Sequence, residues 1–327
     1  MTLILQAALP CFLLGPARTE ITTLELHGGT NVRGAPSADY TQLVLLPLLR
    51  RMGATGMSLK VRSRGFYPRG NGSLFVTVTP VARLRPLLLE TRGEMVHIQC
   101  VVVGGGRSFK SNVRKTAQLA KARLVAKYGK GVKISVHEAD EPDGSVACVS
   151  GAAPAVASAS SADDMSKPTM KERKALQAER DRAQESTLQV QLVATTSTGG
   201  VIAADCLAET AKNRGSVEPS SVVDTAMAKL EEAWNVGGGA VDEHTMDQLI
   251  LFMALAAGES RILCNAPTSI TSLHLETAIQ LCGRLTGATF QVEPQPTPTS
   301  PDVDSCPRLV TCSGSLPAST STAQRTI

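Results

Sequence analysis

His274 is expected at the start of a helix, where its imidazole would be neutral. His274 follows residues 267–272, Pro-Thr-Ser-Ile-Thr-Ser, and apolar residues recur after it at helical spacing. Thr271 or Ser272 is expected to cap this helix, which places His274 in its first turn. The partial positive charge there disfavours imidazolium, and a neutral imidazole can attack an electrophilic phosphorus. An ordinary surface histidine at a helix start is the alternative that spacing alone leaves open.

A second group of polar side chains begins another expected helix, residues 241–256. Asp242 is expected to cap it. His244, Asp247 and Gln248 are three and four residues apart, so they share one helical face and could form a ligand platform. A polar rim above a buried helix is the alternative. The positions expected to be buried are Leu249, Ile250, Phe252 and Met253.

The third candidate is a loop rich in glycine, residues 28–36, whose backbone N–H groups could hold an anion or a base. A tight turn is an equally good interpretation. The chain contains no G-x-x-x-x-G-K-[ST] motif and no protein-kinase signature set, and the glycines at 104–106 do not make one. If ATP is used, a Walker motif does not hold it.

The fourth candidate is a basic run over residues 110–133, which could contact phosphates. A solvated helix face is the alternative. The net charge of +4 and the isoelectric point near 8.6 fit a nucleic-acid partner without indicating one, and the 3% aromatic content argues against base stacking as the main binding device. The basic residues are Lys110, Arg114, Lys115, Lys121, Arg123, Lys127, Lys130 and Lys133.

Composition excludes several classes of protein. The eight cysteines form no C-x-x-C pair and no cluster with zinc spacing, so they are expected to be reduced thiols. The apolar run from Leu3 to Leu14 is short and contains Pro10, so we expect a buried element rather than a signal peptide or a membrane span. No membrane partner is expected.

Strand patterns alternate with helix patterns along the chain, so the fold class is expected to be α/β or α+β. Helices are expected at residues 39–53, 113–128 and 220–233, besides the two above. Strands are expected at residues 20–26, in a hairpin over 57–79, and at 95–103, 132–138 and 188–195.

Other segments mark the organisation of the chain. Residues 141–170 are of low complexity and are expected to be disordered, and the charged residues 171–186 are expected to be a solvated helix or more disorder. Gly237–Gly239 suggests a hinge or a domain junction. The chain is core-like from its first residues, which leads us to expect that a preceding segment is missing.

Four ordered motifs resemble those of RNA 3′-terminal phosphate cyclases. Residues 27–40 resemble the GGTN…AP…DY motif, and residues 64–72 resemble RG(F/Y)YP.GGG. Residues 247–256 match the nucleotide-site helix, and residues 272–279 match the segment of the active-site histidine.

The resemblance implies a large domain of repeated βαβαββ-type units with a smaller α/β domain inserted. Residues 1–90 and 238–295 would form the catalytic domain, with its first repeat missing. Residues 91–237 would form the inserted domain, interrupted by low complexity at about 141–186. Residues 296–327 are expected to be a flexible tail.

The resemblance also implies a reaction. Such enzymes use ATP to convert an RNA 3′-terminal phosphate to a 2′,3′-cyclic phosphate through a histidine–AMP intermediate, which makes His274 the nucleophile. A divalent metal, expected to be Mg²⁺, would serve the triphosphate, with ligands that the sequence does not identify. The residues that would contact the nucleotide are Gln6, Pro36, His244, Thr245, Met246, Asp247 and Gln248.

The chain also departs from the family pattern. The segment GEGGGQ.LR is absent, His244 stands where Tyr is usual, Asn71 replaces a glycine, and the stretch between Ala256 and His274 is longer than usual. The alternatives are therefore an inactive truncated copy, a non-catalytic cyclase-like factor in ribosome biogenesis, or a general RNA- or nucleotide-binding module. A nuclear location is expected, with the cytoplasm as the alternative.

Overall fold

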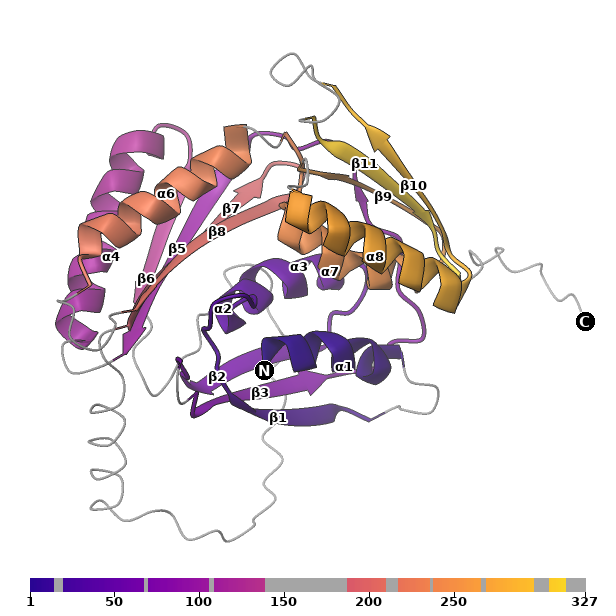
Figure 1. Ribbon diagram of the computed structural model, residues 1–327, viewed down its shortest axis with the longest axis horizontal. Coiled ribbons are helices and arrows are strands. Elements are labelled where there is room, and N and C mark those ends of the chain that lie inside the picture. The colour runs from indigo at the N-terminus through magenta and orange to yellow at the C-terminus, as the bar shows by residue number, and fades with distance from the viewer. Residues whose placement is uncertain are drawn as a thin grey trace, which may run out of the picture.

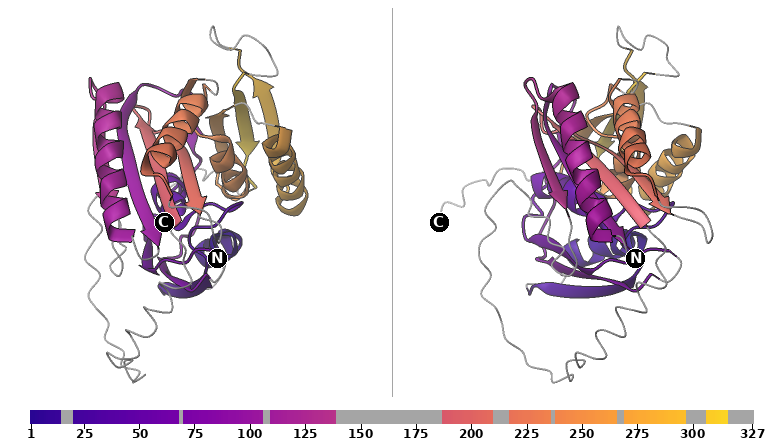
Figure 2. Two further views of the ribbon diagram at one scale, coloured as in Figure 1. Left: turned by 60° about the vertical axis from the view of Figure 1, so that its left-hand side comes forward. Right: turned by 90° about the vertical axis from the view of Figure 1, so that its left-hand side faces the viewer.

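The structure is a computed structural model with a mixed α+β fold (Figures 1 and 2), and this class was predicted. The predictions for residues 141–186 and for Gly237 lie outside the part of the chain that the structure describes. The described residues are 1–14, 20–67, 70–105, 109–138, 187–209, 217–235, 238–265, 269–296 and 306–315.

The first unit pairs a helix with a three-stranded antiparallel sheet. Helix α1 (Thr2–Leu14) buries Leu5, Leu9 and Leu13, which recur every fourth residue and so lie on one face. The predicted buried element is therefore buried along one face only, because Leu3 and Ile4 are 54% and 61% exposed. The sheet has the order β1-β3-β2, and the pairing of β2 with β3 confirms the hairpin predicted over residues 57–79. The strands are β1 (Thr22–Gly28), β2 (Met57–Ser63) and β3 (Gly72–Val78).

A helical segment between β1 and β2 confirms the helix predicted after Asp39. It runs through α2 (Ala38–Tyr40), a π-helical stretch η1 (Thr41–Leu45) and α3 (Leu46–Arg51). The chain leaves it at Gly53, where φ is +102°, a backbone conformation that glycine adopts without strain.

The second unit is a four-stranded sheet of order β6-β5-β7-β8, with two helices covering one face (Figure 1). Alternate residues of β5 point to opposite faces, so Ile98 and Cys100 pack under the helices while Val101 and Val103 join the core of the first unit. The elements are β5 (Met95–Gly105), α4 (Phe109–Tyr128), β6 (Lys133–Glu138), β7 (Thr187–Thr196), β8 (Val201–Glu209) and α6 (Pro219–Asn235).

The third unit packs two helices beside a second four-stranded sheet, of order β10-β11-β9-β4. Val241 bridges Val201 of β8 and Cys264 of β9, so the two sheets meet at this residue. The elements are β4 (Leu88–Leu89), α7 (Glu243–Ala254), β9 (Glu259–Cys264), α8 (Ser269–Thr286), β10 (Thr289–Pro294) and β11 (Arg308–Ser313).

The structure corrects one expectation about chain organisation and adds a detail to another. Residues 308–313 of the predicted flexible tail form β11, which pairs with both β9 and β10. At the predicted hinge or domain junction, a Cβ on Gly239 would lie 2.2 Å from the backbone nitrogen of Asn265, so the backbone is closely packed at this glycine.

Among the described residues, the buried apolar side chains form two clusters. The larger one joins the first and third units, and the smaller one fills the space between α4, α6 and the sheet of the second unit. The predicted domain boundaries stay a prediction. Within the described part of the chain, no helix is both long and apolar enough to cross a membrane.

Candidate active site

Asp242 fixes the start of α7, as predicted from its capping position. Its Oδ1 accepts a hydrogen bond of 2.8 Å from the backbone N–H of Thr245. The hydroxyl of Tyr40 donates to the same oxygen at 2.7 Å, and the backbone N–H of Ala203 in β8 donates to Oδ2 at 3.0 Å. The Asp242 carboxylate therefore links α2 of the first unit, β8 of the second unit and α7 of the third unit.

Tyr40 is buried at this junction. Burial, reinforced by the charge of Asp242, raises the pKa of the Tyr40 phenol well above its usual value. The hydroxyl is therefore a protonated donor at neutral pH, and it also lies 2.6 Å from the hydroxyl of Thr245.

Helix α8 packs against α7 and brings His274 beside Asp247. The Nδ1 atom of His274 lies 3.9 Å from Oδ2 of Asp247, and the two side chains are 63% and 26% exposed. The separation is too long for a hydrogen bond but within the range of an ion pair if the imidazole is protonated.

The predicted cap of the His274 helix is wrong. Helix α8 begins at Ser269, so Thr271 and Ser272 lie inside it and His274 lies in its second turn. Ser and Thr are tolerated within a helix and are not obligatory caps, so a Ser/Thr-rich start does not fix the first helical residue. The field of the helix N-terminus falls off within the first turn, so it acts on His274 less than predicted.

Asp247 has an unusual acidity. Burial raises its pKa to about 6, an effect opposed by the charges of His244 and His274 and reinforced by Asp242. A carboxyl that titrates near neutral pH beside an imidazole is typical of sites that move protons, although structural clusters also produce such shifts.

The other members of the predicted platform separate into exposed and buried groups. The side chain of His244 is exposed, with Nε2 3.8 Å from the carboxylate of Glu243. Gln248 is buried, and its Nε2 donates to the backbone carbonyl of His244 at 2.8 Å. The side chains of Thr245 and Met246 are buried. The four apolar positions predicted to be buried, Leu249, Ile250, Phe252 and Met253, are buried.

Two buried polar side chains of the glycine loop, those of Thr30 and Asn31, form hydrogen bonds within the protein. Asn31 Nδ2 donates to Asp39 at 3.2 Å and to Gln189 of β7 at 2.5 Å. Both terminal nitrogens of Arg64 donate to Asp39, at 2.6 and 2.8 Å. The backbone N–H groups of Thr30 and Asn31 donate to the carbonyl of Gly65, at 2.8 and 3.1 Å.

This network favours the tight-turn interpretation of the loop. Burial by itself would raise the pKa of Asp39, but the Arg64 charge and the hydrogen bonds from Arg64 and Asn31 hold it below its usual value. The two loops also touch, because a Cβ on Gly65 would lie 2.2 Å from the carbonyl oxygen of Gly28. Sequence reasoning missed this junction; the only signal was that Asp39 and Arg64 lie in two of the four family motifs, residues 27–40 and 64–72.

Of the two remaining residues predicted to contact the nucleotide, Pro36 lies in a segment that is bonded to the start of α7, and Gln6 does not. Pro36 is half-buried beside Ser37, whose hydroxyl donates to Gln191 at 3.2 Å, and Tyr40 ties this segment to the start of α7. Gln6 is half-buried on α1, and among the described residues no hydrogen bond or ion pair joins it to α7 or α8. The structure thus clearly brings together His274, Asp247 and His244.

The described residues include no group of three or more His, Cys, Asp or Glu side chains suited to a metal ion. The expected Mg²⁺ stays a prediction, and the residues that would hold it are not identified by the sequence.

A family model described as RNA 3′-terminal phosphate cyclase matches residues 1–292. The chain belongs to the RNA 3′-terminal phosphate cyclase family. The resemblance seen in the four motifs is thereby confirmed.

Two cyclases match most of the chain, and a third matches a shorter part of it. A probable RNA 3′-terminal phosphate cyclase of Dictyostelium discoideum is 29% identical over 95% of this chain and 60% of its own length. The RNA 3′-terminal phosphate cyclase of Drosophila melanogaster is 28% identical over 90% of this chain and 68% of its own. That of Nitrosospira multiformis is 49% identical over 28% of this chain and 24% of its own. The chain spans less than two thirds of the Dictyostelium relative.

Proposed function

We propose that this chain carries the histidine and nucleotide-site helices of an ATP-dependent RNA 3′-terminal phosphate cyclase, a ligase-type enzyme, with His274 as the residue that becomes adenylylated. The observation that carries the proposal is the packing of α8 on α7, which sets the exposed imidazole of His274 3.9 Å from Asp247 in a chain of this family. Imidazole is a competent nucleophile toward phosphorus when one ring nitrogen is unprotonated.

The orientation of the ring assigns the two nitrogens. Because Nδ1 is the atom turned toward Asp247, a proton on Nδ1 is favoured there, and Nε2 keeps its lone pair for attack. In the first step Nε2 bonds to the α-phosphorus of ATP, and the bond to the β-phosphate bridging oxygen breaks, so that pyrophosphate leaves with the electron pair. Asp247 holds the ring and balances the positive charge that it acquires.

Two further steps complete the reaction. An oxygen of the RNA 3′-phosphate attacks the phosphorus of the adenylyl group, which frees His274 and leaves the RNA phosphate activated by AMP. The neighbouring 2′-hydroxyl then attacks that RNA phosphate, loses its proton to solvent, and displaces AMP to form the cyclic ester. Each displacement exchanges one bond at phosphorus.

The described residues fit part of what ATP and a metal need. Mg²⁺ is commonly held by one or two carboxylates together with substrate phosphates, so Asp247 alone could supply a protein ligand. The exposed ring of His244 could stack on adenine. The buried amide of Gln248, already bonded to the helix backbone, is better suited to shaping α7 than to contacting a nucleotide.

Incubation with ATP labelled at the α-phosphate tests the proposal. The wild-type chain is expected to take up label in an adduct that is acid-labile, as a phosphorus–nitrogen bond is, and His274→Asn is expected to take up none. His27→Asn is the matched control, because His27 is also an exposed histidine beside a carboxylate. The Dictyostelium relative serves as the reference for the assay. Label on the relative but not on this chain, or label that persists in His274→Asn, would contradict the proposal.

A non-catalytic role in binding RNA is the second candidate. The observation that favours it is the exposure of both His274 and His244, since catalytic groups commonly work in sites shielded from water. RNA binding without any adenylylation of this chain would support it over the cyclase.

A further inference from the structure

Helix α4 has a one-sided charge. Its sequence, FKSNVRKTAQLAKARLVAKY, contains six lysines and arginines and no aspartate or glutamate. A helix with like charges at spacings of three and four residues is destabilised by repulsion, so its cations need partners from elsewhere or a screening anion.

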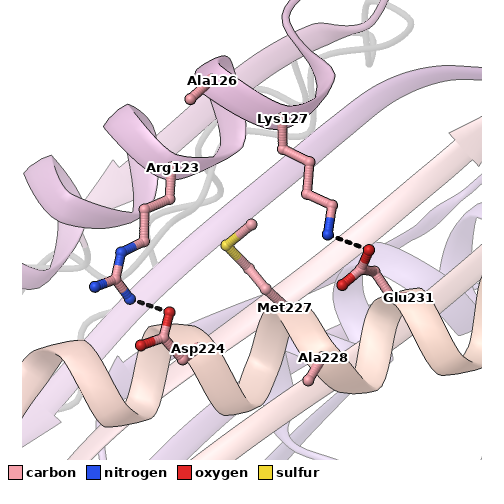
Figure 3. Close-up of a pocket in the computed structure, with 7 residues that line it drawn as sticks. All are labelled: Arg123, Ala126, Lys127, Asp224, Met227, Ala228 and Glu231. Atoms are coloured by element: carbon pink, nitrogen blue, oxygen red, sulfur yellow. Dashed lines mark hydrogen bonds and ion pairs between the residues drawn. The ribbon is translucent and has the colours of Figure 1, made fainter.

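One side of α4 has its partners in α6. Arg123 forms an ion pair with Asp224, and Lys127 forms one with Glu231 (Figure 3). Arg123 also donates to the backbone carbonyl of Ser220 at 3.2 Å. These pairs lie across an open groove between the helices and involve two of the six basic residues of α4.

The other side of α4 has no such partners. Arg114, Lys115 and Lys121 are exposed, and among the described residues none of them forms an ion pair. Arg114 and Lys121 are seven residues, about two turns, apart and point the same way, whereas Arg123 is about half a turn further round. The predicted basic run is therefore two sets of cations with different surroundings.

The unpaired set is held on a rigid element. Val113, Ala117, Ala120 and Leu124 bury the apolar side of α4 against β5 and β6. In Figures 1 and 2, α4 and α8 lie at opposite sides of the molecule. The cations are thus fixed in place at a distance from His274.

We propose that the outer face of α4, formed by Arg114, Lys115 and Lys121, binds the phosphodiester backbone of RNA. Charge complementarity supports this ligand, because contacts between basic side chains and phosphates supply most of sequence-independent binding to nucleic acid. This proposal rests on the proposed function and extends it. The body of the RNA would lie on the second unit, and its 3′ end would reach His274.

Two other polyanions fit less well. A helix that binds an anionic membrane surface inserts its apolar face, but the apolar face of α4 is buried in the protein. An acidic peptide would be held best in a groove, and the groove beside α4 is already bridged by the ion pairs with Asp224 and Glu231.

Binding of a fluorescent single-stranded RNA ending in a 3′-hydroxyl tests the proposal without requiring cyclisation. The variant Arg114→Ala/Lys115→Ala/Lys121→Ala is expected to bind at least tenfold more weakly near 0.1 M salt. The slope of log K against log salt concentration is expected to become shallower by about 2, because each lost phosphate contact on a single strand removes roughly 0.7.

The matched control is Arg123→Ala/Lys127→Ala, which also removes cations from α4 but only those that already have partners. It is expected to leave the salt slope unchanged. An unchanged slope in the triple variant, or an equal loss in the control, would overturn the proposal, as would an equal loss for polyglutamate or phosphatidylserine vesicles. A thermal melt of each variant checks that the fold is retained.

The outcome is independent of the adenylylation assay. His274→Asn is expected to bind this RNA as the wild type does, so failure of the cyclase proposal would leave the RNA measurement intact. If the triple variant leaves the salt slope unchanged while His274 is adenylylated, the proposed RNA-binding surface on α4 is wrong and the proposed role of His274 is unaffected.

Discussion

At the scale of single residues, Asp39 and Arg64 form a buried ion pair whose role is to stabilise the fold. The two side chains are 1% and 2% exposed, and both nitrogens of the guanidinium fork are bonded to the carboxylate. Taking two charges out of water is costly, and good geometry with additional hydrogen bonds is needed to offset that cost. Asn31 supplies one such bond and links the pair to β7.

Removing Arg64 should therefore cost much of the stability. Arg64→Met leaves the carboxylate of Asp39 buried without its partner, and we expect the free energy of unfolding to fall by about 3–5 kcal/mol at neutral pH. Arg64 holds the Asp39 pKa below its usual value, so the deficit should shrink in acid, where the variant's carboxyl is protonated. Urea unfolding at several pH values measures this.

Arg62→Met is the matched control, since Arg62 pairs with Glu25 on the surface. Exposed pairs contribute less than about 1 kcal/mol, so this variant should lose little. Equal losses in the two variants would show that the buried pair has no special role.

The Asp247 carboxylate is expected to have the opposite effect on stability, because its pKa is raised where that of Asp39 is lowered. Its folded-state pKa, about 6, lies above the usual 3.8, so the folded protein takes up a proton as the pH falls through 6, and the ionised carboxylate costs stability above that pH. Asp247→Asn is expected to be more stable than the wild type above pH 6, by on the order of 2 kcal/mol, with the difference gone below about pH 4.

Urea unfolding across pH 4–8 measures this difference, with Glu293→Gln on the exposed β10 as the control that should show none. The same Asp247→Asn variant should adenylylate His274 more slowly, because the ring loses the charge that balances it. Lower stability of Asp247→Asn at pH 8 would contradict the assigned pKa.

At the scale of elements, the junction of α2 and α7 sets the position of the site. The Tyr40 hydroxyl, Asp242 and Thr245 form one buried cluster at the start of α7. Tyr40→Phe is expected to lower the free energy of unfolding by about 1–2 kcal/mol, because a buried acceptor loses a donor. Amide exchange should quicken in the first turn of α7.

Hydrogen-exchange mass spectrometry can locate that change, and Tyr67→Phe is a suitable control because Tyr67 is exposed. If exchange in α7 is unaffected by Tyr40→Phe, the junction does not hold the helix.

Most elements could be predicted from local patterns, and the errors have physical causes. The apolar spacing of α7 and the cap at Asp242 are local, and both predictions were right. The start of α8 was not, because Ser and Thr fit inside a helix as well as before it. The strand β11 was missed because its neighbours in sequence are rich in Pro, Ser and Thr, while its pairing partners, β9 and β10, are set by the tertiary fold.

At the scale of the whole molecule, two apolar cores lie on the two faces of one sheet. Leu230 is buried in the smaller core and Leu249 in the larger. Replacing either by Ala should lower the free energy of unfolding by about 2–5 kcal/mol. Leu230→Ala should speed amide exchange in α4 and α6 first, and Leu249→Ala should do so in α7 and α8.

Hydrogen exchange near the native state distinguishes these outcomes. If each variant speeds exchange uniformly over both cores, the chain opens as one cooperative unit and the two cores have no separate stability.

Sequence patterns also failed to reveal how distant parts meet. The proximity of His274 and Asp247 could not be predicted from local patterns, because the two residues are 27 positions apart in the sequence and nothing local fixes how their helices pack. The role of Asn31, Asp39 and Arg64 depends on β7, more than 120 residues later in the chain, and no periodicity encodes such a contact.

The central place of β11 has a consequence for synthesis of the chain. β9 and β10 are made before residue 295, yet the strand that separates them, β11, ends at Ser313. Until residues 308–313 leave the ribosome, one edge of β9 has no pairing partner. An unpaired strand edge can pair with other chains. A nascent chain paused shortly after β10 is therefore the form most in need of a chaperone.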